Sequence, residues 1–537
     1  MSGFPGHLQA LLSTRAYPHP VGAVQLIETH VSWVLLTGEY AYKIKRPLQH
    51  SFVDQRALER RRFLCHEEVR LNRRFAPELY LGVCVIAAHR GKALVEGHGP
   101  VIEYAVKMCQ FLRGDELDQL LETKRLEPID LEAFGCELAQ IHARLSVAQP
   151  GEDAGHPNAQ VTLILGNLKE CARAGNALGW TFDLHPLLAA LEALLGSTLQ
   201  LRLQRLANGR VRECHGDLHA GNIVRCGSRL LAFDCLEFDP RLRWIDVADE
   251  IAFLLADLEA RQRSLHAQAF LAGYLTESGD YQACALHPLF RAHRALVRAK
   301  ITALSAAQPR TVSVDISVAR SLYESYVDAA RRAVAPKRPI LVLMCGLSGS
   351  GKTWLAQRLA PALAAVHVRS DIERKRLAGL PAMDRTDSPV GEGLYSPDAS
   401  QRVYGRLAEC AADTLRGGYT TIVDATFGRA EDRSCFRDLA KRFGVLSCVV
   451  YCRAPRQVLQ ARIAERQRRQ QDPSEADLAV LTWQEERFDP PEPHEGSAVL
   501  EAQSAESSAI EALIQRIAAL STSEGGNSSD GRVRLNA

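Results

Sequence analysis

The sequence contains little that would indicate an extracellular or membrane protein. No C-x-x-C pair occurs among its 14 cysteines, which argues against a zinc ribbon or a dithiol redox site. The cysteines are scattered and several lie in apolar stretches, such as Val83–Ile86 and Cys448–Cys452. This pattern predicts reduced, buried thiols in a cytoplasmic protein. We see no basic start followed by a long apolar core, and no apolar run as long as a membrane span, so no membrane partner is expected.

The sequence also lacks an excess of charge of either sign. The formal net charge is +2, and we find no basic patch interleaved with aromatic residues, so nucleic acid is not expected as a partner. A hydrophobic fraction of 46% with 24% charged residues is ordinary for a soluble globular protein. The length of 537 residues suggests two to four domains. Function therefore has to be inferred from motifs.

The sequence does contain a glycine-rich loop between an apolar strand and a helix. The stretch LVLMCGLSGSGKT covers Leu341–Thr353 and fills the template G-x-x-x-x-G-K-[ST]. Glycines let backbone N–H groups turn inward around phosphate oxygens, Lys352 can reach the β- and γ-phosphates, and the Thr353 hydroxyl can bind Mg²⁺. The predicted nucleotide-binding residues are Gly346, Leu347, Ser348, Gly349, Ser350, Gly351, Lys352 and Thr353.

The position of this loop also predicts the domain organisation. Such a loop normally follows the first strand of a doubly wound α/β domain, so a new domain should begin near Pro339. The preceding residues suffice for a domain of their own. We predict a first domain at 1–334, a linker at 335–339, a P-loop kinase domain at 340–522, and a disordered Ser/Gly/Asn-rich tail at 523–537.

The first domain begins with a pattern of strands and continues mostly with helices. Lys43 and Lys45 lie two residues apart on one predicted strand and should share one of its faces. The predicted elements are strands between Val21 and Lys45, a helix across Asp54–Phe75, strands near Leu79–Ala87 and Val101–Met108, and helices thereafter.

The segment RECHGDLHAGNIVRCGSRLLAFDCLEFDP, residues 212–240, carries the candidate chemistry of this domain. His215, Asp217 and Asn222 have the H-x-D-x-x-x-x-N spacing of a kinase catalytic loop. A short hairpin then leads to Asp234, where a kinase carries the metal-binding Asp of D-F-G. Asp217 can accept a proton from a substrate hydroxyl, whereas Asn222 and Asp234 can converge on Mg²⁺. We expect His215 to brace the loop.

A zinc pair formed by His215 and His219 is the competing interpretation of this segment. That motif needs a helix and a glutamate after the first histidine. Gly216 and Gly221 disfavour a helix, and the glutamate is missing. A purely structural polar turn is the other alternative.

CHGDLHAGNI and the following LLAFD strand resemble the aminoglycoside phosphotransferase family, over about residues 22–329. The resemblance implies a protein-kinase-like α+β fold, with a small sheet N-lobe, a helical C-lobe and a nucleotide cleft between them. Asp217 would be catalytic, and Asn222 and Asp234 would bind metal. The strand lysine would be Lys43, with Lys45 as the alternative, and its helix partner Glu68, with Glu67 as the alternative.

The sequence departs from the kinase pattern at two places. No G-x-G-x-x-G loop occurs, and the D-F-G triplet is Asp-Cys-Leu. Farther on, Asp246, Asp249 and Glu250 resemble the acidic patch that opens the family's next helix. We interpret these acids as helix capping.

Polar residues follow two predicted strands of the second domain, whose strands are expected at 365–369, 419–423 and 445–452. Asp371 comes after the first of these, where it could act as the base for an acceptor hydroxyl or cap the next helix. Asp424 follows the second and suits a role on Mg²⁺. Residues 379–398 could form a substrate lid. A helix across 455–470 carries four arginines that could bind phosphates or form a solvated face: Arg462, Arg466, Arg468 and Arg469.

The second half resembles P-loop kinases of the AAA_33 type over about residues 339–520, on the segments GLSGSGKT, VRSDIERKRL and TTIVDATF. The order of both halves is similar to proteins described as bifunctional aminoglycoside phosphotransferase/ATP-binding proteins. We therefore expect a phosphotransferase that uses ATP and Mg²⁺ at two sites to phosphorylate hydroxyls of small molecules. The alternatives are one active kinase domain regulated by a nucleotide-binding partner domain, or a nucleic-acid end kinase.

Overall fold

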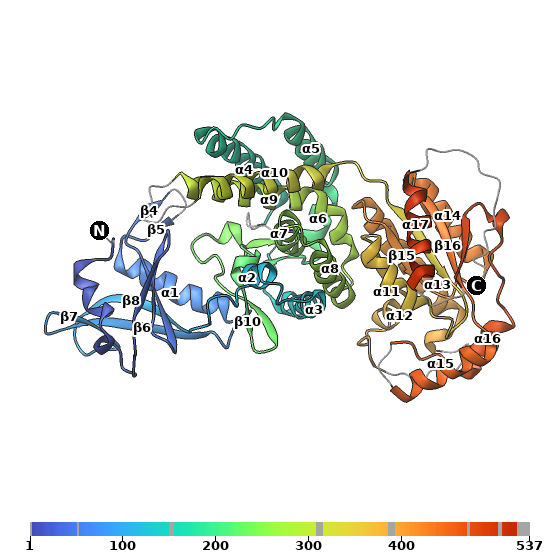
Figure 1. The fold of residues 1–537 in the computed structure, drawn as a ribbon, viewed down its shortest axis with the longest axis horizontal. Coiled ribbons are helices and arrows are strands. Elements are labelled where there is room, and N and C mark those ends of the chain that lie inside the picture. Colours follow the sequence, from blue (N-terminus) through green and yellow to red (C-terminus); the bar gives the residue numbers. More distant parts are fainter. Residues whose placement is uncertain are drawn as a thin grey trace. The chain divides into compact units, whose positions relative to one another are not determined.

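In the computed structural model the chain divides into two compact units (Figure 1). The first holds the chain up to Arg263 together with Phe290–Ala330, and the second holds Ser264–Leu289 and the chain from Arg331 onward. The structure describes residues 3–50, 53–149, 155–307, 315–384, 393–469, 473–502 and 507–522. The predicted tail at 523–537 and part of the predicted lid, 385–392, lie outside these ranges. The domain bounds given above stay a prediction.

The first unit begins with a six-stranded antiparallel sheet, as the kinase-like fold predicts. Its order is β1-β2-β3-β8-β6-β7. The helix α1 (Leu58–Asn72) contacts β8 and β6. The strands are β1 (Gln25–Glu28), β2 (Ser32–Leu36), β3 (Tyr40–Lys45), β6 (Tyr80–His89), β7 (Lys92–Val95) and β8 (Val101–Cys109).

Alternation along β3 separates an apolar face from a charged one. Tyr42 and Ile44 are fully buried in a core with Trp33 and Leu35. Lys43 and Lys45 point to the other side because successive side chains of a strand alternate. That side is covered by α1, so both lysines face this helix.

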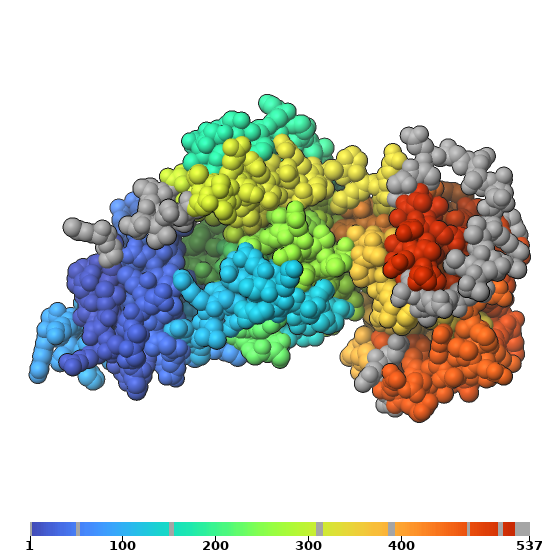
Figure 2. Space-filling model, in the orientation of Figure 1, coloured from blue at the N-terminus to red at the C-terminus, as the bar shows by residue number. Residues whose placement is uncertain are grey.

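The rest of the first unit is mostly helical (Figure 1). Three two-stranded sheets occur in the described part of this unit. They pair β4 (Gln49–His50) with β5 (Val53–Asp54), β9 (Val211–Glu213) with β12 (Trp244–Asp246), and β10 (Ile223–Cys226) with β11 (Arg229–Ala232). The cyan residues of Figure 2, which include α2 and α3, form much of the visible face of this part. The helices are α2 (Leu117–Glu122), α3 (Pro128–Arg144), α4 (Pro157–Ala177), α5 (His185–Ser197), α6 (Leu199–Ala207), α7 (Val247–Ala260), α9 (His287–Ala306) and α10 (Ile316–Val334).

The second unit contains a five-stranded parallel sheet of order β14-β15-β13-β16-β17. Its strands are β13 (Ile340–Cys345), β14 (Val366–Arg369), β15 (Thr421–Asp424), β16 (Leu446–Cys452) and β17 (Ala498–Ala502). The first strand in sequence, β13, lies at the centre. The chain runs from β13 to one side and later returns to the other, which creates a switch point at the carboxyl end of β13, where ligands of such sheets bind.

Helices cover both faces of this parallel sheet. Leu355 and Leu359 of α11 pack with Leu513 and Ile517 of α17 on one face, and α17, drawn in red, lies outermost there (Figures 1 and 2). The helices α13 and α14 contact the sheet as well. The sequence analysis did not predict β17. The helices are α8 (Ser264–Ser278), α11 (Lys352–Ala362), α12 (Ser370–Leu377), α13 (Pro397–Arg416), α14 (Ala430–Phe443), α15 (Arg456–Arg469), α16 (Leu478–Glu485) and α17 (Ser507–Thr522).

No described helix has the combination of length and apolar composition needed to cross a membrane.

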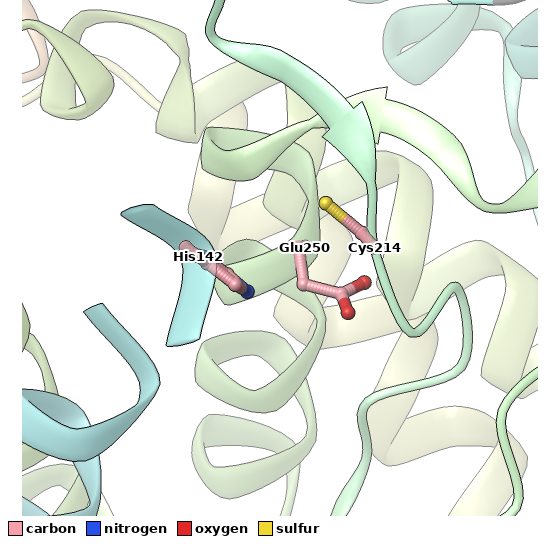
Figure 3. Close-up of side chains that lie close together, drawn as sticks. All are labelled: His142, Cys214 and Glu250. Carbon is pink, nitrogen blue, oxygen red and sulfur yellow. The ribbon is translucent and has the colours of Figure 1, made fainter. Parts of the chain in front are cut away.

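A buried polar cluster lies beneath the 214–222 loop of the first unit. His142 from α3, Cys214 after β9 and Glu250 from α7 point toward one another (Figure 3), and their functional atoms all lie within 4.8 Å of each other. The Glu250 carboxylate accepts hydrogen bonds from the backbone N–H of His215 at 2.7 Å and of Gly216 at 3.1 Å. Glu250 therefore anchors the loop to α7.

These contacts correct part of the capping interpretation of the acids near the start of α7. Asp246 is the N-cap, and its carboxylate accepts from the N–H of Ala248 at 2.8 Å. Asp249 instead binds Arg294 at 2.7 Å, and Glu250 holds the 214–222 loop. Both carboxylates are buried, which requires such partners.

The pKa of the Glu250 carboxyl is higher than that of an ordinary glutamate. Burial raises the pKa of Glu250 from 4.5 to about 7, against the opposing effects of Arg294 and the two backbone N–H groups. Burial also lowers the pKa of His142 to about 3 and raises that of Cys214 well above its ordinary value, so neither neighbour is charged at neutral pH.

We predict that Glu250 makes the first unit less stable as pH rises from about 4.5 to about 7. In this window the folded protein holds a proton on Glu250 that the unfolded chain has released, so the free energy of unfolding falls with rising pH, by about 2–3 kcal/mol for this group. Glu250→Gln keeps an acceptor oxygen without titrating and should remove this contribution. Urea denaturation at several pH values measures it, with Trp354 and Trp483 replaced by Phe so that fluorescence reports the first unit.

The exposed Glu192 of α5 supplies the control, since Glu192→Gln should leave the pH dependence unchanged. Identical pH slopes in the parent and Glu250→Gln would contradict the assignment.

Candidate functional site

In the first unit, both strand lysines bind the same helix carboxylate. Lys43 Nζ lies 2.8 Å from one oxygen of Glu68, and Lys45 Nζ contacts the other oxygen. The alternative partner, Glu67, binds Arg70 at 2.7 Å and Arg243 at 2.9 Å instead. The structure therefore brings Glu68 and both lysines together, and leaves Glu67 in a separate ion pair.

The two lysines differ in their second partner. Lys43 also contacts the carboxylate of Asp234, whose side chain is 43% exposed, whereas Lys45 contacts the buried Glu237. Lys43 is thus the lysine that faces the predicted metal ligand. Glu237 was not singled out in the sequence, although its place three residues after Asp234 could have drawn attention to it.

Neighbouring opposite charges keep Lys43 and Glu68 ionised. Burial alone would disfavour the charges, but Asp234 and Glu68 hold the pKa of Lys43 well above its ordinary value. Likewise, Lys43 and Lys45 outweigh the effect of burial and lower the pKa of Glu68 to about 2. Each charge is stable because its counter-charge is within hydrogen-bond distance.

The 214–222 loop places Asp217 and Asn222 against each other. The Asn222 side-chain amide donates to Asp217 Oδ2 and to the Asp217 backbone oxygen, both at 3.0 Å. Ile223 pairs with Ala232, so Asn222 and Phe233 lie opposite each other. The Phe233 N–H donates to the backbone carbonyl oxygen of Asn222 at 2.9 Å. The hairpin therefore brings Asn222 close to the segment that carries Asp234.

His215 and His219 both support this loop. His215 is fully buried, and Nε2 lies 2.8 Å from the carbonyl oxygen of Phe233. Burial lowers the pKa of His215 to about 4, so the ring is neutral at pH 7. His219 Nδ1 accepts from the N–H of Gly221 at 3.1 Å, and Nε2 lies 3.5 Å from Asp217 Oδ2. These bonds use both rings as braces, which disfavours a zinc pair.

Asp217 is held as a carboxylate. Burial acts to raise its pKa, but His219, Arg298 and His215 together hold the pKa below the ordinary value. The bond from Asn222 also fixes the orientation of the carboxylate. The Asp217 carboxylate is therefore ionised and fixed in orientation.

Asp234 has a left-handed backbone, with φ of 66°. Its N–H donates to the Tyr80 hydroxyl at 3.0 Å, and the next N–H, of Cys235, donates to Asn72 Oδ1 at 3.0 Å. Side chains of β6 and α1 thus determine the turn that presents the Asp234 carboxylate. The Phe of a D-F-G triplet is replaced by the buried Cys235 without loss of this turn.

In the second unit, β13 ends in the glycine-rich loop as predicted. Gly346, Gly349 and Gly351 have φ values of 143°, 83° and 92°. A Cβ at Gly346 would lie 2.4 Å from the Cys452 carbonyl oxygen, so glycine is required there for close approach. Lys352 Nζ donates to the Leu347 carbonyl at 2.9 Å, which places the ammonium group across the loop.

Thr353 and Asp424 meet at the carboxyl end of the sheet. Thr353 Oγ donates to Asp424 Oδ2 at 2.6 Å, and His367 Nε2 lies 3.3 Å from the same oxygen. Burial would raise the pKa of Asp424, but His367, Lys352 and Thr353 lower it below the ordinary value. His367 was not predicted to lie at the site. The register pairs it with Ile422, two residues before Asp424 and therefore on the same face of the sheet.

Both units offer donors that fit Mg²⁺, a cation that prefers oxygen ligands. In the first unit these are the amide oxygen of Asn222 and the carboxylate of Asp234. In the second they are the hydroxyl of Thr353 and the ionised Asp424.

A cavity of about 470 Å³ opens beside the glycine-rich loop, and Asp371 lies in its wall. The helix-cap alternative for Asp371 is wrong, since α12 begins at Ser370 and the flanking Arg369 makes no side-chain capping bond. Asp371 is in the first turn of α12, on the side of the cavity that also contains Tyr395.

The four arginines of α15 divide into two pairs. Arg462 and Arg466 line the cavity. Arg468 and Arg469 are exposed and bind Glu465 at 2.8 and 2.7 Å, so they form the solvated face. The solvated-face interpretation therefore holds for Arg468 and Arg469, and phosphate binding by Arg462 and Arg466 stays a prediction.

Comparison with protein families and structures follows the same division. Residues 51–287 match the model of the phosphotransferase enzyme family, and residues 341–491 match the model of an AAA domain. An uncharacterized protein of Mycobacterium tuberculosis is 28% identical over 431 residues, which cover 79% of this chain and 82% of the relative.

Two solved structures are among those similar to this chain. Amicoumacin kinase in complex with AMP-PNP, Ca²⁺ and Ami is 16% identical and covers 58% of this chain and 90% of its own, with a TM-score of 0.35. The Mycobacterium tuberculosis APS kinase in complex with AMPPNP and APS is 22% identical and covers 35% of this chain and 100% of its own, with a TM-score of 0.26.

The two family matches agree with the two folds and with the motifs that each fold carries. The chain is a kinase-type phosphotransferase, in which a domain of the phosphotransferase enzyme family is followed by an AAA-type P-loop kinase domain.

Proposed function

We propose that both units are active, and that each transfers the γ-phosphoryl group of ATP to a hydroxyl of a small molecule. The observation that carries the proposal is that each unit retains an ionised acid, a set of oxygen donors and a cation in one place. Phosphoryl transfer needs positioning and charge stabilisation more than covalent chemistry. Mg²⁺, held by these oxygen donors, would supply positive charge that neutralises the phosphates in both sites.

In the first unit, Asp217 orients the acceptor hydroxyl and takes its proton. Lys43, held by Glu68, binds the donor phosphates once nucleotide displaces its contact with Asp234. Asn222 and Asp234 are the residues that hold Mg²⁺. Lys45 and Glu237 keep Glu68 in place from the far side.

In the second unit, the N–H groups of residues 346–353 surround the donor phosphates, with Lys352 on the terminal pair. Thr353 and Asp424 are the residues that hold Mg²⁺. Asp371 is the candidate base for the acceptor hydroxyl. It lines the same cavity as Lys352 and Thr353, which supports this role.

We predict that Asp217→Asn lowers turnover of the first site by about 10²- to 10⁴-fold, because the amide cannot accept the hydroxyl proton. Transfer from γ-labelled ATP to a fractionated metabolite extract measures the effect, in a Lys352→Ala background that isolates the first site. The exposed Asp54 offers the matched control, and Asp54→Asn should keep the parental rate. A first site that loses less than threefold on Asp217→Asn does not use this carboxylate as its base.

We predict that Lys352→Ala abolishes transfer by the second site and spares the first, because the ammonium group serves only the phosphates of its own loop. The same labelling assay measures the loss in an Asp217→Asn background, where only the second site is active. The parent background, in which products of the first site should persist, shows whether the first site is spared. Lys441→Ala, which changes an exposed lysine of α14, should have no effect. Parental labelling in the Asp217→Asn/Lys352→Ala double variant would refute a role for either site.

The regulatory alternative makes a different prediction for the same variants. If the first unit only senses nucleotide, all labelled products disappear with Lys352→Ala, and none depends on Asp217. A product that survives Lys352→Ala and disappears with Asp217→Asn excludes that alternative.

A further inference from the structure

The cavity of the second unit carries an excess of positive charge. Its wall includes three acidic and six cationic side chains: Asp371, Asp424 and Asp432, and Lys352, Arg374, Arg429, Arg462, Arg466 and Arg487. Asp432 is neutralised by Arg429 at 2.9 Å, and Asp424 is bonded to Thr353. The remaining acids, Asp371 and Asp424, are outnumbered by five cations, one of which, Arg487, pairs with Glu486. The cavity is therefore suited to anionic ligands.

Three of these arginines bind carbonyl oxygens rather than carboxylates. Arg374 donates to the Leu394 carbonyl at 2.8 Å, Arg466 to that of Ala476 at 2.7 Å, and Arg462 to that of Gly349 at 3.2 Å. None of the three forms an ion pair with a described residue. In addition, the buried Nε atoms of Arg374 and Arg466 have no hydrogen-bond partner in the described part of the chain. No carboxylate of the described residues therefore balances the charge of these guanidinium groups, and two of their Nε donors are unused.

The three arginines belong to different parts of the cavity. Arg462 touches the glycine-rich loop and so lies beside the donor phosphates. Arg374 lies over the ring of Tyr395, with its Cζ 4.9 Å from the ring centroid. Burial and then Asp371 raise the pKa of the Tyr395 hydroxyl to about 12, whereas Arg374 and Arg466 act to lower it. Arg374, Arg466 and Asp371 thus act on the same hydroxyl.

Glu475 is the other carboxylate near Tyr395, and it binds Lys375 at 3.2 Å. Its charge is therefore balanced by a lysine outside the cavity wall. The charge near Asp371 remains positive.

We infer that Arg374 and Arg466 form an anion subsite for the phosphate acceptor of the second unit. The acceptor then carries an oxyanion group, such as a phosphate or sulfate ester, in addition to its reacting hydroxyl. Arginine binds such groups with two parallel N–H donors, which fixes orientation as well as charge. The inference rests on the proposed activity of this unit.

The proposed reaction is a direct transfer of the γ-phosphoryl group from ATP to the acceptor hydroxyl. The bond between the γ-phosphorus and the β,γ-bridging oxygen breaks, and the acceptor hydroxyl oxygen forms the new bond to phosphorus. The hydroxyl proton moves to Asp371, and ADP leaves. The acceptor's oxyanion, held by Arg374 and Arg466, takes no part in bond changes.

The test uses full-length Asp217→Asn protein, so that labelling reports the second site. A metabolite extract freed of nucleoside triphosphates is divided by anion exchange into retained and unretained fractions, and each is incubated with γ-labelled ATP. We expect label only in the retained fraction. The labelled compound is then identified and its unlabelled form used as the acceptor for kinetics, with inorganic sulfate as a competing anion at constant ionic strength.

Arg374→Gln and Arg466→Gln should each raise the KM of this acceptor roughly 10- to 100-fold, with a smaller effect on kcat. Arg374→Lys, which keeps the charge, should recover part of the loss and guards against a folding defect. Arg468→Gln is the matched control on α15, because Arg468 is exposed and paired with Glu465. With Mg-ATP saturating, so that the glycine-rich loop is occupied, sulfate should raise the apparent KM of the acceptor.

Label in the unretained fraction, or an unchanged acceptor KM in both glutamine variants, would overturn the subsite. The absence of label in both fractions would instead contradict the activity proposed for the second unit, and the subsite with it.

Discussion

Glu68 holds two ammonium groups in a buried space, and the arrangement of the first site depends on this ion pair. A buried carboxylate without a counter-charge would be strongly destabilising, and so would a buried lysine. Lys43 and Lys45 on one side of β3 satisfy Glu68 on α1, and they reach Asp234 and Glu237 beyond it. The strand, the helix and the metal-ligand segment are thereby tied together by charge.

In the second site, the arrangement of the strands, and not a buried ion pair, brings the functional groups together. The parallel sheet brings Lys352 and Thr353 to the same edge as Asp424, because β13 and β15 are neighbours and both end there. Thr353 is the second residue of α11, the helix after β13, and Asp424 ends β15, so the shared sheet edge allows their 2.6 Å hydrogen bond. Each unit therefore carries a self-contained set of groups, on unrelated folds.

Much of this organisation could be predicted from the sequence, because the motifs fix spacing. The glycine-rich loop predicted its strand and helix, and the segment 212–240 predicted the hairpin between Asn222 and Asp234. The hydrogen bond between Asn222 and Asp217 was not predicted. What could not be predicted depends on contacts between distant segments. Only the fold shows that Glu68 serves both lysines, that Glu250 holds the 214–222 loop, and that Arg468 faces solvent while Arg466 faces the cavity.

The capping interpretations of two acidic segments were wrong in part, because an acid near a helix start can either cap the helix or bind groups from elsewhere. Asp371 has the residue type of a helix cap, yet α12 begins one residue earlier and leaves its carboxylate at the cavity. The acids near the start of α7 resembled a set of caps, but only Asp246 caps, since arginine and backbone donors from elsewhere engage the other two. Strand β17 escaped notice because its place at the sheet edge is set by pairing with β16.

We infer that one chain binds two nucleotides, and the number of nucleotides bound per chain tests this inference most directly. Calorimetric titration of the full chain with AMP-PNP and Mg²⁺ should give two molecules per chain, falling to one in Asp234→Asn and to one in Lys352→Ala. A single molecule per chain that is insensitive to Asp234→Asn would contradict the account.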